Sequence, residues 1–188
     1  MTVVRILGIG GSLGETSSSL KALEIAIAAA HTDGAETELI DLRELDLPMY
    51  VPNAPEPQAA HRLAEASRRA HGFLWCSPLY HGSMSGSFKN ALDWLELLAH
   101  DTPPYLADKP VGLIATAGGA QALQGINAME YAVRALRGYT VPMVVPVPRA
   151  WKLFDAEGAM TDAKVAGQLA SLGREVHRVA EKMRPRGV

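Results

Sequence analysis

Short apolar runs alternate with amphipathic stretches along almost the whole chain, and this alternation restricts the possible folds more than any other feature. Runs of β-branched and other apolar residues predict five strands, at 3–9, 37–41, 72–77, 109–116 and 139–147. Apolar residues that recur every three or four positions predict five helices, at 20–30, 58–70, 88–99, 122–136 and 165–183. Because the strands are almost continuously apolar, we expect an α/β fold in which helices cover both faces of a parallel sheet. The prolines of the last strand predict an edge or irregular position for it.

The composition is typical of a folded globular protein. Of the 188 residues, 48% are hydrophobic and 20% are charged, unlike the polar and highly charged composition of disordered chains. The length fits one domain, so we expect residues 1–188 to form a single domain. A formal net charge of −2 provides no basic field for nucleic acid. We therefore expect small-molecule partners and no nucleic-acid partner.

Cysteine usage and the N-terminal residues indicate a compartment. Cys76 is the only cysteine, which excludes an internal disulfide and a CxxC redox or zinc motif, and we expect it to be buried. Residues 1–11, MTVVRILGIGG, place an arginine inside a short apolar run. This pattern matches neither a signal peptide nor a membrane span of about 18 or more apolar residues. We expect a cytoplasmic protein with no membrane partner.

Three loops of unusual composition follow predicted strands, at 10–19, 78–87 and 117–121. In a parallel α/β sheet, ligands bind outside the carboxyl ends of the strands, near the point where the strand order reverses. The sequence therefore predicts that these loops together form a binding site.

The first loop is rich in hydroxyl groups at the start of a helix. It lacks the third glycine of G-x-G-x-x-G, because Leu13 stands there, and it lacks the G-K-[ST] of a P-loop. Its hydroxyls come from Ser12, Thr16 and the three serines 17–19. Hydroxyls and the amides of a helix N-terminus together suit a terminal phosphate. The alternative is that Ser17 or Ser18 only caps the helix.

The segment SPLYHGSMSGSFKNALDWLELL resembles the flavin-binding segment of the NAD(P)H-dependent FMN reductase family. The matching residues are Pro78, Tyr80, Gly86, Phe88, Lys89, Asn90, Ala91, Leu92, Asp93 and Trp94. Gly11, Ser12 and Ser17 match the family's first loop, and DLPMY, KPVGLIATAGG and FDAEGAMTD extend the resemblance over almost the whole chain. Two residues depart from it: Gly14 replaces the usual arginine and Ser19 replaces a common asparagine.

This resemblance implies a flavodoxin-like three-layer sandwich with a five-stranded parallel sheet in the order 2-1-3-4-5. It also implies an FMN-dependent oxidoreductase that takes hydride from NADPH or NADH. A small acceptor such as free flavin or a quinone would receive the electrons, and the enzyme would be a homodimer or homotetramer. Because the cofactor performs the chemistry, we expect neither a catalytic side chain nor a metal.

The cofactor-binding residues that the resemblance and the loop positions imply lie in all three loops. They are Gly11, Ser12, Ser17, Ser18, Ser19, Pro78, Leu79, Tyr80, His81, Gly82, Ser83, Thr116, Ala117, Gly118 and Gly119. The paired glycines 118 and 119 allow backbone amides to approach the flavin ring closely. Amide donors there would stabilise the negative charge that develops on a reduced flavin.

Several alternatives stay open from the sequence alone. Tyr80 either flanks the flavin or packs at the surface, and His81 either gates the pocket or is solvated. Trp94 is expected to pack against a loop or a partner subunit. The protein as a whole has two further interpretations: a flavodoxin-like electron carrier without its own NAD(P)H turnover, or a binding module without flavin. The chain lacks the acidity and the T/S-x-T-G-x-T loop of flavodoxins, which favours the enzyme.

Overall fold

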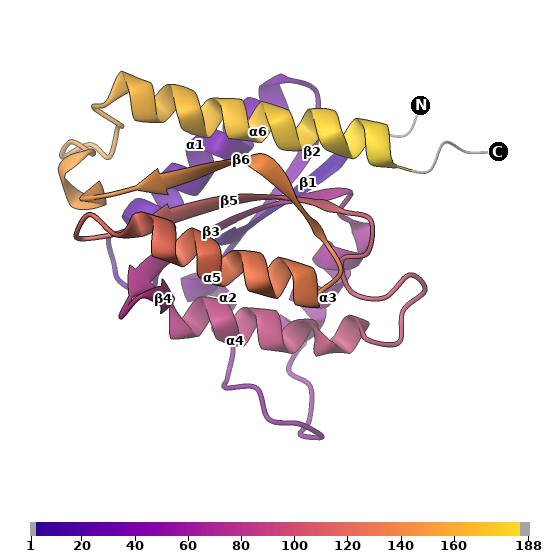
Figure 1. Cartoon of the computed structure of the whole chain (residues 1–188). Coiled ribbons are helices and arrows are strands. Elements are labelled where there is room, and N and C mark those ends of the chain that lie inside the picture. Colours follow the sequence, from indigo (N-terminus) through magenta and orange to yellow (C-terminus); the bar gives the residue numbers. More distant parts are fainter. Residues whose placement is uncertain (1–2, 185–188) are drawn as a thin grey trace.

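The computed structural model describes residues 3–184, arranged as helices on either side of one central sheet (Figure 1). The strands are β1 (Arg5–Gly10), β2 (Glu36–Asp41), β3 (Gly72–Tyr80), β4 (Ser83–Met84), β5 (Pro110–Thr116) and β6 (Tyr139–Val147). The α-helices are α1 (Ser18–Thr32), α2 (Leu42–Leu45), α3 (Gln58–Arg69), α4 (Gly86–Trp94), α5 (Ala122–Ala135) and α6 (Ala163–Met183). Two short 3₁₀ helices occupy Leu95–Leu98 and Ala150–Lys152.

The five long strands form a parallel sheet in the order β2-β1-β3-β5-β6. This is the expected order 2-1-3-4-5 when the long strands are numbered along the chain. β6, which contains Pro142 and Pro146, lies at one edge, and its register against β5 shifts between Val111 and Leu113. The edge position and the irregularity predicted from the prolines are both confirmed. Both follow from the chemistry of proline, which cannot donate a ladder hydrogen bond.

Both faces of the sheet are buried, as the continuous apolar strands predict. In β3, Phe73 and Trp75 belong to the core under α3, α4 and α5, whereas Leu74 and Cys76 belong to the core under α1 and α6. Successive side chains of a strand point to opposite faces, so a strand covered on both sides needs apolar residues at every position. The expected burial of Cys76 is confirmed, since its side chain is fully buried and burial raises the pKa of its thiol.

Helices α1 and α6 pack closely against each other on one face of the sheet (Figure 1). The two helices approach each other tightly at Gly173, where an added Cβ would lie only 2.0 Å from the carbonyl oxygen of Ala26. A hydrogen atom in place of a side chain therefore sets the separation of these two helices.

The segment 78–83, expected as a loop, is instead a β-hairpin. β3 continues through Tyr80 and pairs with the short antiparallel strand β4, with Tyr80 opposite Ser83. His81 and Gly82 form the turn, with φ angles of +49° and +82°, as a two-residue hairpin turn of the primed type requires. The sheet thus has six strands instead of five. The sequence did not predict the extension of β3 into a hairpin, because Pro78 and Gly82 are typical loop residues. A one-turn helix, α2, also adds to the five helices expected.

Candidate functional site

A hollow opens at the carboxyl ends of β1, β3, β5 and β6. Its wall consists of Ser12, Thr16, Ser18, Ser19, Pro78, Leu79, Tyr80, Thr116, Ala117, Gly118, Ala150 and Trp151. The chain proceeds from β1 to β2 on one side and returns to β3 on the other, so the hollow lies at the switch point of the sheet, where such folds bind ligands. All three predicted loops contribute to the wall. Of the predicted residues, Gly11, Ser17, His81, Gly82, Ser83 and Gly119 lie outside this wall.

The serines at the start of α1 divide into two roles. Ser17 is the N-cap of the helix, and its Oγ accepts a hydrogen bond of 3.1 Å from the backbone N–H of Leu20. This is the capping role that the sequence left open. Ser12 and Ser18 are half-buried and line the hollow, beside the first amides of α1, which have no carbonyl partner within the helix. This combination of hydroxyls and helix amides suits a phosphate group.

Ser19 and Thr116 join the first loop to the third. Their hydroxyl oxygens are 2.6 Å apart and buried, although the residues are 97 positions apart in the sequence. A buried hydroxyl pair of this kind fixes the separation between the start of α1 and the end of β5.

The third loop is hydrogen-bonded to the end of β6 and to the segment that follows it. Ala117 donates its backbone N–H to Val147, Ala150 donates to Ala117, and Arg149 donates to Gly119, each at 3.0 Å. An added Cβ at Gly118 would meet no atom within 4 Å, so the backbone here faces open space. The loop therefore presents bare peptide groups to the hollow, as the approach of a flat ring requires.

Two exposed aromatic side chains line the hollow. Tyr80, at the end of β3, was predicted, whereas Trp151 was not. Trp151 follows β6, and none of the three predicted binding loops lies after that strand. The rule that ligands bind at carboxyl ends, applied to every strand, identifies this segment.

The motif FKNALDW, which carries the family resemblance, acts mainly on another loop. Trp94 Nε1 donates to the carbonyl oxygen of Pro48 at 2.8 Å, and Asn90 Nδ2 donates to the same oxygen at 2.9 Å. Asn90 Oδ1 accepts from the N–H of Tyr50, whose ring meets Trp94 edge-on at 5.2 Å between centroids. Trp94 is buried against its own chain. Of the two expected roles, packing against a loop is therefore the one seen.

Gly14 faces a second hollow next to the first, with Ser12 and Thr16 common to both. Lys21 and Arg43 line this second hollow from α1 and α2, and Arg43 Nη1 donates to the carbonyl oxygen of Glu15 at 3.2 Å. Three carboxylates line it as well, those of Glu15, Glu24 and Asp41. The two cations are thus balanced by acids, and Arg43 supports the loop through its backbone.

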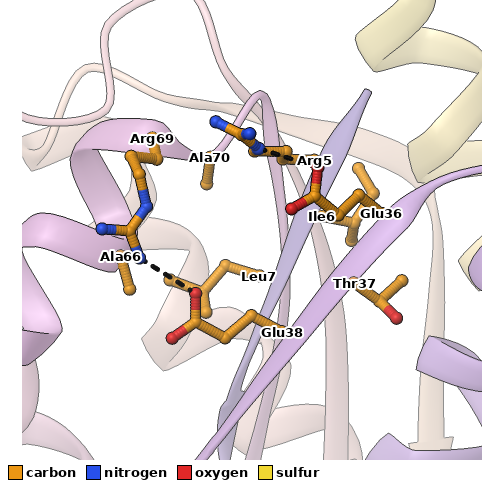
Figure 2. Close-up of a pocket in the computed structure, with 9 residues that line it drawn as sticks. All are labelled: Arg5, Ile6, Leu7, Glu36, Thr37, Glu38, Ala66, Arg69 and Ala70. Carbon is orange, nitrogen blue, oxygen red and sulfur yellow. Dashed lines mark hydrogen bonds and ion pairs between the residues drawn. The ribbon is translucent and has the colours of Figure 1, made fainter. Parts of the chain in front are cut away.

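A third hollow lies near the amino ends of β1 and β2, beneath the end of α3 (Figure 2). Its charges are already paired: Arg5 with Glu36 at 3.0 Å, and Arg69 with Glu38 at 3.3 Å. It contains no predicted site residue. With its charges neutralised internally, this hollow offers no excess charge to a ligand.

The described residues contain neither a candidate membrane span nor a candidate metal site. Within residues 3–184, no helix is long and apolar enough to cross a bilayer. Over the same residues, no group of three or more His, Cys, Asp or Glu side chains is placed to hold a metal ion.

Comparison with known proteins assigns the chain to a family. Residues 4–152 match the family described as NADPH-dependent FMN reductase. The NADPH-dependent FMN reductase ArsH of Shigella flexneri is 31% identical over 182 residues, which cover 97% of this chain and 71% of that protein. The NADPH azoreductase of Bacillus sp. (strain OY1-2) is 37% identical over 116 residues, 60% of each protein. The chain spans less than two thirds of that azoreductase.

The solved structures agree on the fold. The flavoenzyme NAD(P)H:(acceptor) oxidoreductase FerB from Paracoccus denitrificans has a TM-score of 0.77 at 24% identity, over 96% of this chain and 99% of its own. The expected flavodoxin-like architecture is confirmed. The chain therefore belongs to the NADPH-dependent FMN reductase family and is an oxidoreductase that uses FMN and a reduced nicotinamide.

Proposed function

We propose that this chain binds FMN in the hollow at the carboxyl ends of the strands and passes electrons from NADPH or NADH to a small acceptor, such as free flavin or a quinone. The observation that carries this proposal is the convergence of four separate segments on one hollow. These segments combine hydroxyls at a helix N-terminus, bare peptide groups at Gly118 and two exposed aromatic rings. Together these features suit a flat ring that carries a phosphate.

Each part of the hollow has a distinct role in this proposal. Ser12, Ser18 and the first amides of α1 bind the phosphate. The backbone near Gly118 donates hydrogen bonds to the pyrimidine end of the ring, and Tyr80 and Trp151 border the ring. FMN, when bound, supplies the hydride-accepting chemistry, while the chain binds the ring, orients it and limits its contact with water. The wall of the hollow contains no carboxylate, histidine, lysine or arginine side chain, and this proposal assigns no proton transfer to a side chain.

We also propose that the protein acts in the cytoplasm as a homodimer or homotetramer. The support for a reducing compartment is the single, fully buried cysteine. Large exposed apolar residues, including Met49, Val51 and Tyr131, provide surface that self-association would cover. Sedimentation of the purified protein measures the assembly directly.

An assay of the purified protein tests the proposed function. FMN fluorescence is titrated with the protein, and oxidation of NADPH and of NADH is followed with and without FMN. Acceptors are then compared in one panel of free flavin, a quinone and an azo compound, since some relatives are named azoreductases. We expect FMN binding and turnover above the rate with flavin alone. FMN binding without NAD(P)H oxidation would instead indicate a flavodoxin-like electron carrier.

A further inference from the structure

Residues 149–152 form one rim of the hollow proposed to bind FMN, and this rim carries an exposed aromatic ring with cations beside it. Trp151 lines the hollow and is 65% exposed, whereas the other two tryptophans, Trp75 and Trp94, are 0% and 3% exposed. The Nζ atom of Lys152 lies over the Trp151 ring, 4.8 Å from its centroid. Arg149, on the other side of Trp151 in the sequence, is also exposed. An exposed indole with a cation beside it can both stack on a planar ring and attract an anion.

This rim is hydrogen-bonded to the loop that follows β5. Arg149 adopts a left-handed backbone conformation with φ of +49° and donates its N–H to Gly119 at 3.0 Å. Ala150 donates its N–H to Ala117 at the same distance. A non-glycine residue in this conformation carries a conformational cost. At Arg149 the left-handed conformation accompanies the hydrogen bond to Gly119, which belongs to the loop that lines the hollow.

The charges of the rim and of the hollow differ. The wall of the hollow contains no charged side chain. Within residues 3–184, no ion pair joins Lys152 or Arg149 to a carboxylate. The nearest acids along the chain are Asp155, whose Oδ1 accepts the N–H of Ala159, and Glu157. Positive charge at the mouth is therefore available to a ligand that enters from solvent.

We propose that Trp151 and Lys152 form the recognition element for the electron donor: the indole stacks on a planar ring of the nicotinamide nucleotide and the ammonium group binds one of its phosphates. The inference rests on the proposed function, because a donor that reduces FMN must reach the mouth of this hollow. The donor has aromatic rings and phosphates in one molecule, and the rim offers an aromatic face and a cation 4.8 Å apart. Arg149 adds a second positive charge to the same segment.

Substitutions at the rim test the inference in the FMN-loaded protein. Lys152→Ala is expected to raise the KM for the donor roughly fivefold or more, since it removes a hydrogen bond to a charged group, with little change in kcat. Trp151→Ala is expected to raise the same KM, and Trp151→Phe to restore part of the loss, because phenylalanine keeps an aromatic face. Lys182→Ala is the matched control, an exposed lysine in the last turn of α6 at the other end of the sheet. It should leave the KM unchanged.

The two donors locate the phosphate that Lys152 binds. A loss for NADPH alone assigns Lys152 to the 2′-phosphate, and an equal loss for NADPH and NADH assigns it to the pyrophosphate; both outcomes support the proposal. Unchanged KM values for both donors would overturn it. So would a loss confined to an anionic aromatic acceptor, with the donors unaffected, because the rim would then bind the acceptor.

Two binding measurements separate failure of this inference from failure of the proposed function. Calorimetric titration of the FMN-loaded protein with NADP⁺ measures binding of the nucleotide without turnover. Lys152→Ala should lower the affinity for NADP⁺, in parallel with the expected rise in the KM for the donor. FMN affinity of each variant is measured in parallel. Weaker FMN binding at unchanged NADP⁺ affinity would show that Trp151 contacts the flavin alone and would overturn its role toward the donor. An absence of FMN-dependent oxidation in the wild type would instead contradict the proposed function.

Discussion

Ser12 and Ser17 stand in one loop, and we predict that removing their hydroxyls has opposite consequences. Ser17 Oγ accepts the N–H of Leu20 at 3.1 Å and is almost fully buried. Ser17→Ala should therefore lower the free energy of unfolding by about 1 kcal/mol, the typical worth of a serine N-cap. Ser12 lines the hollow that we propose binds FMN and is only half-buried. Ser12→Ala should leave the free energy of unfolding nearly unchanged.

The effect on FMN affinity should be the reverse. A hydrogen bond to a charged group contributes on the order of 1.5 to 3 kcal/mol, so Ser12→Ala should weaken FMN binding roughly tenfold or more. Ser17→Ala should weaken it much less, because the main partner of that hydroxyl is the helix itself. Riboflavin, which has the ring but no phosphate, should bind both variants about as well as it binds the wild type.

Urea unfolding of the FMN-free protein measures the first effect, and fluorescence titration with FMN and with riboflavin measures the second. If Ser17→Ala lost FMN affinity tenfold while its unfolding curve was unchanged, Ser17 would be a phosphate ligand and the assignment to capping would be wrong. Equal losses of FMN and riboflavin in Ser12→Ala would show that Ser12 only shapes the loop.

Two further predictions concern stability. Gly173→Ala should lower the free energy of unfolding by about 3 kcal/mol or more, because its Cβ would lie 2.0 Å from the carbonyl oxygen of Ala26; Gly167→Ala in the same helix, whose Cβ meets no atom within 4 Å, should be neutral or stabilising by up to about 1 kcal/mol. Equal effects in urea unfolding would contradict the packing argument. Burial lowers the pKa of Lys109 from 10.5 to about 8, so the folded protein binds this proton less tightly than the unfolded chain. As the pH rises from 8 toward 10.5, wild type should gain roughly 2 to 3 kcal/mol over Lys109→Met; parallel pH profiles would refute this.

The burial of both faces of the sheet could be predicted because it depends on patterns within single segments, whereas the strand order was implied by the family resemblance alone. Phe73 and Leu74 are adjacent apolar residues, and they reach opposite cores. A strand with one solvated face would instead alternate apolar and polar residues. The extension of β3 into a hairpin could not be predicted in the same way. Histidine adopts a positive φ more often than most residues do, but it is not among the usual turn residues, so His81 before Gly82 did not by itself indicate a hairpin turn.

Resemblance to a family identified the cofactor but did not identify every residue that lines the hollow. Asn90 and Trp94 are prominent in the matching segment, yet both bind the backbone of Pro48. Trp151, which lines the hollow, stands outside that segment. A motif marks residues that a fold needs together, and a loop anchor satisfies that need as well as a ligand contact does. Spatial position was required to separate the two.

The hydrogen bonds that assemble the site depend on sheet register, and register is not visible in any one segment. Ser19 meets Thr116 because β5 ends level with the start of α1, and Gly119 meets Arg149 because β6 runs beside β5 as far as Val147. A shift of one residue in β5 would turn the Thr116 side chain to the other face of the sheet, and a shift in β6 would move the backbone N–H of Arg149 away from Gly119. The same bonds link the loop that faces the hollow with the segment that carries Trp151. One backbone arrangement therefore positions both the proposed donor site at Trp151 and the proposed flavin site at Gly118.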